Sequence, residues 1–201
     1  MAIFGSTSDT QHYQSSKRAE AQFLDSNCGQ NNNYKILVTY ASQFGSTSGV
    51  AEAIGDALCR GGASVDIKWV KNVKDLNDYD AVIIGSAIQY DKWMPEAVKF
   101  VTTHQKILST LPVAFFFTCL TLSFRNENTE RQANAYADKI YALHPQIKPV
   151  SVGRFAGVLD YSNMSFLIRL AFKIFSLIVG VKEGDYRDWN AIRSWAKGLH
   201  L

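Results

Sequence analysis

The sequence predicts an α/β protein built on a doubly wound, five-stranded parallel sheet. Three observations support this fold class. Short apolar runs typical of buried strands recur along the chain, helical patterns lie between most of them, and hydrophobic residues make up 47% of the 201 residues. The length fits one domain with an additional segment, and the net charge of +3 does not indicate a nucleic-acid-binding protein.

The apolar runs give the expected elements. Strands are predicted at residues 36–40, 63–70, 81–85, 113–118 and 150–158. The first helix is predicted because apolar residues from Val50 to Leu58 repeat at helical spacing, and the Gly61-Gly62 pair ends that pattern. Further helices are predicted at residues 95–108, 129–143 and 186–199, whereas the connection at 71–80 has room for only about one helical turn.

Residues 1–33 differ in composition from the rest of the chain. Seventeen of these 33 residues are Ser, Thr, Asn, Gln or Gly, too polar a composition to form a core. The sequence therefore predicts a flexible polar tail over 1–33 and a domain over 34–201. No secretory signal is expected, because a basic segment followed by an apolar run is missing at the start.

The cysteines and histidines do not indicate a metal site. Cys28, Cys59 and Cys119 are widely spaced and odd in number, so neither a zinc site nor a disulfide framework is predicted, and a reducing, cytoplasmic location fits best. His104, His144 and His200 are likewise separated from one another and have no Cys or carboxylate companions.

The loop after the first predicted strand carries the strongest functional pattern. It is rich in hydroxyl groups and leads directly into a helix, so backbone N–H groups and hydroxyls could bind one phosphate without a cation. Its candidate residues are Ser42, Gln43, Phe44, Gly45, Ser46 and Thr47. A dinucleotide-binding G-x-G-x-x-G and a P-loop are both missing here, but a hydroxyl-rich helix cap without a ligand remains an alternative.

Two further loops follow the third and fourth predicted strands. In a doubly wound sheet, ligands bind beyond the carboxyl ends of the strands, so these loops are expected beside the first one. Their candidate residues are Ser86, Ala87, Ile88, Gln89, Tyr90, Thr118, Cys119 and Leu120. They offer apolar and aromatic faces to a planar ring, and flavin mononucleotide (FMN) has both a ring and a phosphate. Cys119 is interpreted as a buried thiol rather than a redox group.

Four stretches of the sequence resemble known proteins, one of them the flavodoxins in general and three a narrower family. The S-x-x-G-x-T loop at 42–47 resembles that of the flavodoxins, whose strand order is 2-1-3-4-5. The stretches 84–90, 114–120 and 184–189 resemble the menaquinone-dependent, oxygen-independent protoporphyrinogen dehydrogenases. The resemblance covers roughly residues 35–199 and implies FMN bound by the three loops, a porphyrinogen substrate and a quinone acceptor at a membrane.

An apolar insertion at residues 164–179 precedes the last predicted helix. Twelve of its 16 residues are apolar, and its polar residues share one helix face. The segment is too short to cross a bilayer, so we expect an extra amphipathic helix that either packs in the core or a dimer interface, or lies on the membrane surface.

Three functions are compatible with these observations. The first is an FMN-dependent dehydrogenase that oxidises a reduced organic substrate, such as protoporphyrinogen IX, and reduces a quinone at the inner face of the membrane. The second is a soluble flavodoxin-type electron carrier, although such carriers are usually acidic to complement basic partners. The third is an interaction module that keeps the fold without flavin. No catalytic side chain is predicted, because the flavin would carry the chemistry.

Overall fold

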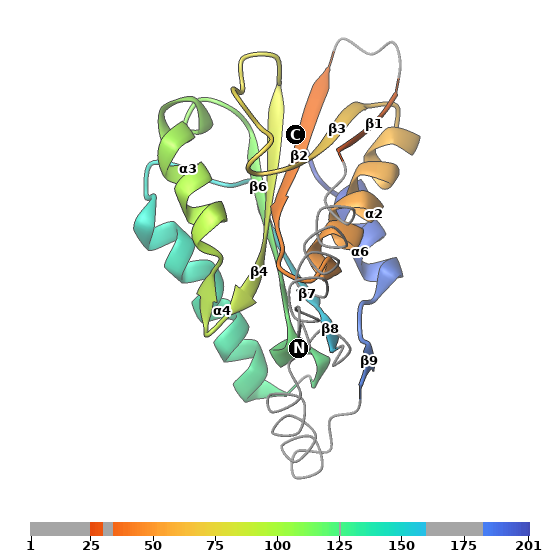
Figure 1. Cartoon of the computed structure of the whole chain (residues 1–201), viewed down its shortest axis with the longest axis vertical. Coiled ribbons are helices and arrows are strands. Elements are labelled where there is room, and N and C mark those ends of the chain that lie inside the picture. Colours follow the sequence, from red (N-terminus) through yellow and green to blue (C-terminus); the bar gives the residue numbers. More distant parts are fainter. Residues whose placement is uncertain (1–24, 30–33, 125, 160–182) are drawn as a thin grey trace, which may run out of the picture.

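The computed structural model describes residues 25–29, 34–124, 126–159 and 183–201. Five parallel strands form the centre of the sheet (Figure 1). They are β2 (Lys35–Ala41), β3 (Ser64–Trp69), β4 (Ala81–Gln89), β6 (Val113–Cys119) and β7 (Ser151–Ala156). They lie in the order β3-β2-β4-β6-β7, so the predicted parallel sheet and its 2-1-3-4-5 order are confirmed.

Short antiparallel strands extend this centre. Strand β1 (Ser26–Cys28) pairs with β3 at the edge of the sheet, and β5 (Lys92–Trp93) pairs with β4. A separate pair joins β8 (Val158–Leu159) to β9 (Gly184–Asp185). The sequence did not predict β1, β5 and β9, because two or three residues are too few to show an alternating pattern. The single strand predicted at 150–158 is divided in the structure between β7 and β8.

Strand β1 corrects part of the prediction for residues 1–33. The segment expected to be a flexible tail contributes an edge strand, and the Asp25 carboxylate accepts hydrogen bonds from the Trp69 backbone N–H (3.3 Å) and the Asn72 amide (3.0 Å). The stretch Ser-Asn-Cys has no apolar pattern of its own and is ordered by pairing with β3. The other tail positions, 1–24 and 30–33, lie outside the described residues.

The cysteine prediction is also wrong in one respect. Cys28 and Cys59 form a disulfide, with their Cα atoms 6.1 Å apart. Cys28 lies in β1 and Cys59 in the last turn of helix α2 (Ser46–Arg60), so only the tertiary fold brings them together. A separation of 31 residues in the sequence carries no sign of such a pair.

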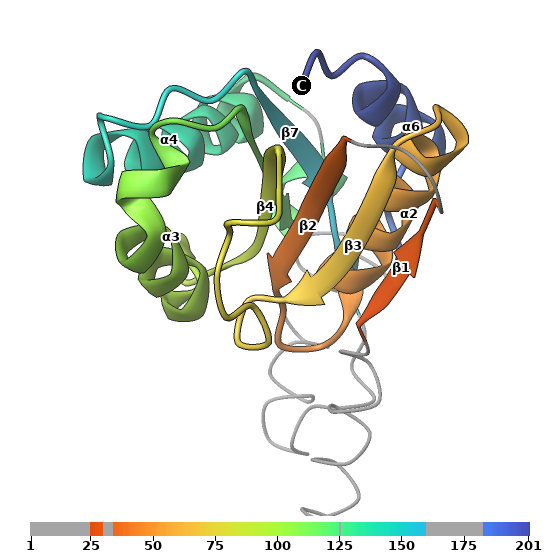
Figure 2. The same cartoon turned by 90° about the horizontal axis from the view of Figure 1, so that it is seen from above.

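Helices cover both faces of the sheet (Figure 2). Helices α2 (Ser46–Arg60) and α6 (Trp189–Lys197) lie on one face, and α3 (Pro95–Leu108) and α4 (Glu127–Leu143) on the other. A short 3-10 helix, η1 (Leu120–Ser123), follows β6. Side-chain caps set two of the starts, because Asn126 accepts hydrogen bonds from the first turn of α4 and Asp188 from that of α6. The predicted start at 186 was therefore three residues early.

Alternate residues of the central strands fill two cores. In β6, Phe115 and Phe117 pack toward α3 and α4, whereas Ala114 and Phe116 pack toward α2 and α6. All four are fully or almost fully buried. A parallel sheet buried on both faces explains why its strands read as continuous apolar runs. Residues 71–80 form turns and irregular structure without a helix.

The insertion at 164–179 lies outside the described residues. Among the helices that the structure describes, none is both long and apolar enough to cross a membrane.

Candidate functional site

The three predicted loops meet at the carboxyl edge of the sheet (Figure 1). Strands β2, β4 and β6 end at the same edge of the sheet, since Ala41 is in register with Ser86, and Ala87 with Thr118. The three predicted loops therefore lie at one edge, but the strands run further than predicted: residues 86–89 are the end of β4 and residues 118–119 the end of β6. We keep the name loops for the segments 42–47, 86–90 and 118–120. A hydrogen bond between the side-chain amides of Gln43 and Gln89 joins the first two loops directly.

The first loop forms a tight turn into α2. Gly45 has a φ of +84°, a left-handed conformation that favours glycine, and its N–H donates to Ser42 Oγ over 3.0 Å. The Ser48 hydroxyl donates to the Gly45 carbonyl over 2.7 Å, and the first turn of α2 has no acidic side chain. The first amides of a helix lack partners within the helix and carry its positive dipole end. This turn can accept a phosphate group.

The Thr47 and Thr118 hydroxyls join the first loop to the third. Their Oγ1 atoms lie 2.9 Å apart, and the two residues are 0% and 3% exposed. Ser86 is similarly buried and accepts a hydrogen bond from the Met94 N–H over 2.9 Å. These side chains hold the loops in place from the interior.

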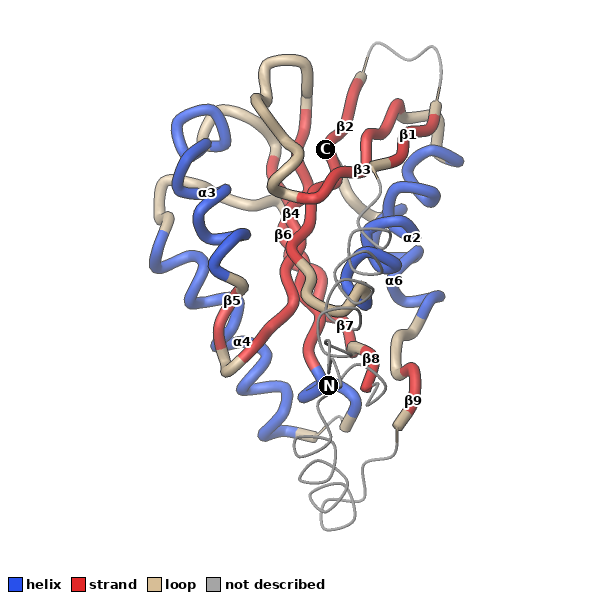
Figure 3. Tube along the Cα trace, in the orientation of Figure 1, coloured by secondary structure: helices blue, strands red, loops and turns tan. Residues whose placement is uncertain are grey.

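The second loop is an unusual hairpin between β4 and β5 (Figure 3). Tyr90 and Asp91 have φ angles of +49° and +60°, which bulky side chains rarely adopt. Helix α4 holds the turn, because the Asp91 carboxylate accepts hydrogen bonds from Tyr136 Oη (2.5 Å) and Gln132 Nε2 (2.9 Å), and Lys139 Nζ donates to the Asp91 carbonyl (2.6 Å).

These bonds also affect ionisation. The hydrogen bond from Tyr136 lowers the pKa of Asp91, and burial together with that bond raises the pKa of Tyr136 to about 12. At neutral pH the carboxylate is charged and the phenol is neutral, which is the pairing that the short hydrogen bond requires.

Each of the three loops exposes one large apolar side chain. Phe44 is 50% exposed, Tyr90 96% and Leu120 37%. Exposed apolar groups at the same edge of the sheet indicate a surface that binds an apolar partner. A planar heteroaromatic ring would cover such a surface, with the amides of α2 beside it for a phosphate.

The remaining candidates differ in accessibility. Gly45, Ser46, Ala87, Ile88 and Gln89 are half-buried, Gln43 is exposed, and Ser42 and Cys119 are buried. Burial raises the pKa of the Cys119 thiol to about 11. Cys119 is therefore a neutral thiol at physiological pH, which agrees with its interpretation as a buried thiol.

One cation at this edge escaped the sequence analysis, which found none in the first loop. Arg187 Nη1 donates to the Ser46 carbonyl over 3.1 Å, although 141 residues separate the two. Arg187 belongs to the 184–189 stretch that carried part of the family resemblance, but no local pattern there indicated a contact with α2.

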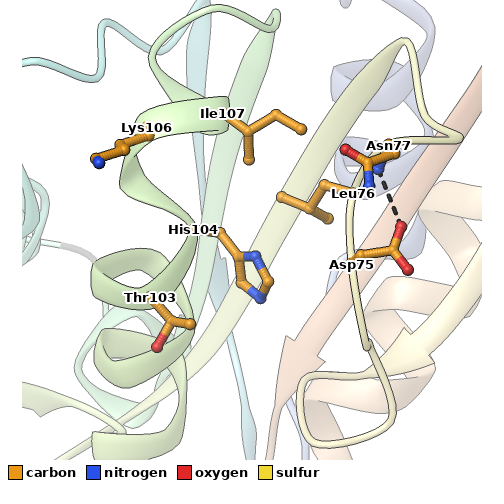
Figure 4. A pocket seen from close by; sticks show the side chains of 7 residues that line it. All are labelled: Asp75, Leu76, Asn77, Thr103, His104, Lys106 and Ile107. Carbon is orange, nitrogen blue, oxygen red and sulfur yellow. Dashed lines mark hydrogen bonds between the residues drawn. The ribbon is translucent and has the colours of Figure 1, made fainter.

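A pocket of about 200 Å³ lies elsewhere, between the 71–80 connection and the last turns of α3 (Figure 4). Leu76, His104 and Ile107 are among its seven lining residues, and none of the predicted site residues belongs to it. Within the described part of the chain, no group of three or more His, Cys, Asp or Glu side chains is arranged to hold a metal ion.

Comparison with known proteins defines the class. Residues 37–185 match the family described as "Flavodoxin domain", so the chain belongs to this family. A solved short-chain flavodoxin associated with a PDU bacterial microcompartment has the same fold, with a TM-score of 0.51, 13% sequence identity and coverage of 83% of this chain and 96% of that one. The predictions of a flavodoxin-like fold and of FMN as the cofactor are thereby confirmed.

Two curated relatives indicate which flavodoxin-like proteins the chain resembles in sequence. A Leishmania major protein named protoporphyrinogen IX dehydrogenase [quinone] is 30% identical over 170 residues, covering 81% of this chain and 73% of the relative. An Escherichia coli K12 protein of the same name is 27% identical over 175 residues, covering 83% and 96%. The resemblance to the protoporphyrinogen dehydrogenases is confirmed, and the chain is a flavodoxin-like oxidoreductase.

Proposed function

We propose that this protein is an FMN-dependent dehydrogenase that oxidises a porphyrinogen and reduces a quinone. One observation carries the proposal: the three loops at the carboxyl edge of the sheet each expose a large apolar side chain, namely Phe44, Tyr90 and Leu120. The names of the two relatives supply the substrate and the acceptor.

The residues present fit FMN. The amides at the start of α2 and the Ser46 hydroxyl would bind the phosphate, and the backbone of the 86–90 and 118–120 loops would meet the polar edge of the ring. Tyr90 is almost fully exposed beside Asp91, which helix α4 holds in place, and would be available to cover the ring face. Bound FMN would supply the capacity to accept and return a pair of electrons.

The proposed reaction needs no catalytic acid or base from the three loops. An oxidation step removes two electrons and two protons from the porphyrinogen, and both pairs end on the quinone, which becomes a quinol. The chain contributes by binding and orienting the ring and by excluding water from its face. Cys119 takes no part, because its thiol is buried and neutral.

We further propose that the reaction takes place on the cytoplasmic surface of a membrane, reached through residues 164–179. The support comes from the sequence, since the spacing of Arg169 and Lys173 would place them on one side of a helix in a segment with twelve apolar residues of 16, and quinones are lipid-soluble. Reversing both charges to Glu should abolish co-sedimentation with anionic vesicles and leave FMN binding unchanged. Full co-sedimentation of this variant would refute the membrane contact.

The substrate is tested by following porphyrin fluorescence without oxygen, with protoporphyrinogen, a menaquinone analogue and the FMN-loaded protein. We expect porphyrin formation that requires both protein and quinone. In a parallel arm, NAD(P)H replaces the porphyrinogen. Quinone reduction by NAD(P)H with no porphyrin formation would overturn the substrate assignment.

A matched pair of variants tests the site. Tyr90→Ser removes an aromatic face at the proposed ring position and should weaken FMN binding by roughly threefold to tenfold. Tyr141→Ser removes an exposed tyrosine from the outer side of α4 and should leave binding unchanged. Equal effects of the two substitutions would argue against a ring site at Tyr90.

A further inference from the structure

Arg187 connects the carboxyl-terminal part of the chain to the start of α2. Its Nη1 donates to the Ser46 carbonyl at the first residue of α2, over 3.1 Å. The same guanidinium donates to both carboxylate oxygens of Asp185, from Nε (2.8 Å) and from Nη2 (2.7 Å). The planar group therefore binds Asp185 on one side and α2 on the other.

The neighbouring residues fix the position of the guanidinium. It lies 4.3 Å from the centre of the Trp189 ring, a cation–π contact, and the side chain is only 16% exposed. Gly49 leaves the space for it, because a Cβ on Gly49 would stand 2.7 Å from Nη1. A lysine could not reproduce this arrangement, since its single ammonium lacks the planar fork.

The charges around Arg187 argue for positioning rather than for direct binding of an anion. Asp185 neutralises the guanidinium, and the hydrogen bond from Arg187 lowers the pKa of Asp185. Glu52 also interacts with Arg187 electrostatically, across the next turn of α2. The donor that reaches α2 is directed at the Ser46 backbone carbonyl and holds the first turn of the helix.

We propose that Arg187 is a positioning residue for the phosphate end of FMN. By binding the Ser46 carbonyl it holds the first turn of α2 in the orientation in which its N–H groups meet a phosphate. The inference rests on the proposed FMN site and names a residue beyond 37–185, the part of the chain that matches the family.

The test compares FMN with riboflavin, which lacks the phosphate. The full chain, Arg187→Gln and Arg187→Lys are freed of flavin and titrated with each compound, with flavin fluorescence as the readout. Arg193→Gln is the matched control, because Arg193 is exposed on α6 and its Nη1 donates only within that helix, to the Trp189 carbonyl.

We expect both Arg187 variants to bind FMN about tenfold to a hundredfold more weakly, the loss typical of a charge-assisted hydrogen bond, and to bind riboflavin within about twofold of the unmodified chain. Inorganic phosphate serves as a second probe. It should raise the melting temperature of the unmodified apoprotein and of Arg193→Gln, but less so that of the Arg187 variants.

The outcomes separate the two proposals. If the unmodified chain binds no FMN, the proposed function fails. If it binds FMN but the Arg187 variants match it, or lose FMN and riboflavin affinity equally, the positioning role is refuted. Circular dichroism establishes that each variant is folded, and Arg187→Lys, which keeps the charge, provides a second folded variant if Arg187→Gln does not fold.

Discussion

The buried hydroxyl pair of Thr47 and Thr118 allows a quantitative test of how the cofactor loops are held. The two Oγ1 atoms are 2.9 Å apart and shielded from water. Replacing either residue by valine keeps the shape and leaves the other hydroxyl buried without its partner. Such an unpaired group costs about 1–3 kcal/mol of unfolding free energy, whereas replacing both partners by apolar groups is nearly neutral.

The single variants Thr47→Val and Thr118→Val should therefore each lose about 1–3 kcal/mol, and the double variant less than either single variant. For a domain of this size, each 1 kcal/mol corresponds to a melting-temperature change of roughly 2–4 °C. The assay is urea unfolding of the apoprotein followed by circular dichroism, with the disulfide kept oxidised. Thr110→Val is the control, because the Thr110 side chain is exposed and its hydroxyl donates to the Ile107 carbonyl at the end of α3.

The double-mutant cycle also tests whether the two hydroxyls depend on each other. If the double variant loses the sum of the two single losses, the hydroxyls do not depend on each other and the proposed connection between α2 and β6 is wrong. A cycle with a coupling energy of about 1–3 kcal/mol supports it.

Four further predictions concern other parts of the molecule. Gly45→Ala places a Cβ in a left-handed conformation and should cost about 1–2 kcal/mol of apoprotein stability in urea unfolding, together with weaker FMN binding; an unchanged midpoint would contradict the turn geometry. Replacing Cys28 and Cys59 by serine removes their disulfide and should lower the free energy of unfolding by about 3–4 kcal/mol by the loop-entropy relation. Mass spectrometry of a non-reduced digest of the unmodified chain that shows free thiols at both positions would contradict the pairing. The Cys119 thiol, with a pKa raised to about 11, should resist iodoacetamide at pH 8 in the folded protein and react after unfolding, so rapid native alkylation would contradict its burial. The hydrogen bond from Arg187 lowers the pKa of Asp185 in the folded protein, so Asp185 contributes stability above its ordinary pKa of 3.8, and this contribution is lost as the pH falls through the folded-state pKa. In acid unfolding, Asp185→Asn should therefore lose less stability below pH 4 than the unmodified chain. Identical acid transitions would refute the pair with Arg187.

The central fold could be predicted because its signals are local and strong. Strand β6 is a continuous apolar run, since both faces of a parallel sheet are buried, and α3 is predicted at residues 95–108, the bounds that the structure shows. The elements that were missed, β1 and the Cys28–Cys59 disulfide, depend on contacts with an edge strand and a helix end far away in sequence. No residue pattern within β1 encodes those contacts.

In the candidate site, too, local features could be predicted from the sequence and contacts between distant residues could not. The loops at 42–47, 86–90 and 118–120 could be located from topology, because doubly wound sheets bind ligands where these strands end. The sequence could not show that Thr47 and Thr118 bond to each other in the interior, or that Asp91 is held by three side chains of α4. It also could not place Arg187 beside Ser46, because that contact depends on how the last strand and helix return to α2.

The most direct test of the account is a calorimetric titration of the flavin-free full chain with FMN, followed by the same titration with riboflavin. The account predicts binding of one FMN per chain, much tighter than that of riboflavin, because the amides at the start of α2 bind the phosphate. Absence of FMN binding, or equal affinity for the two compounds, would contradict it.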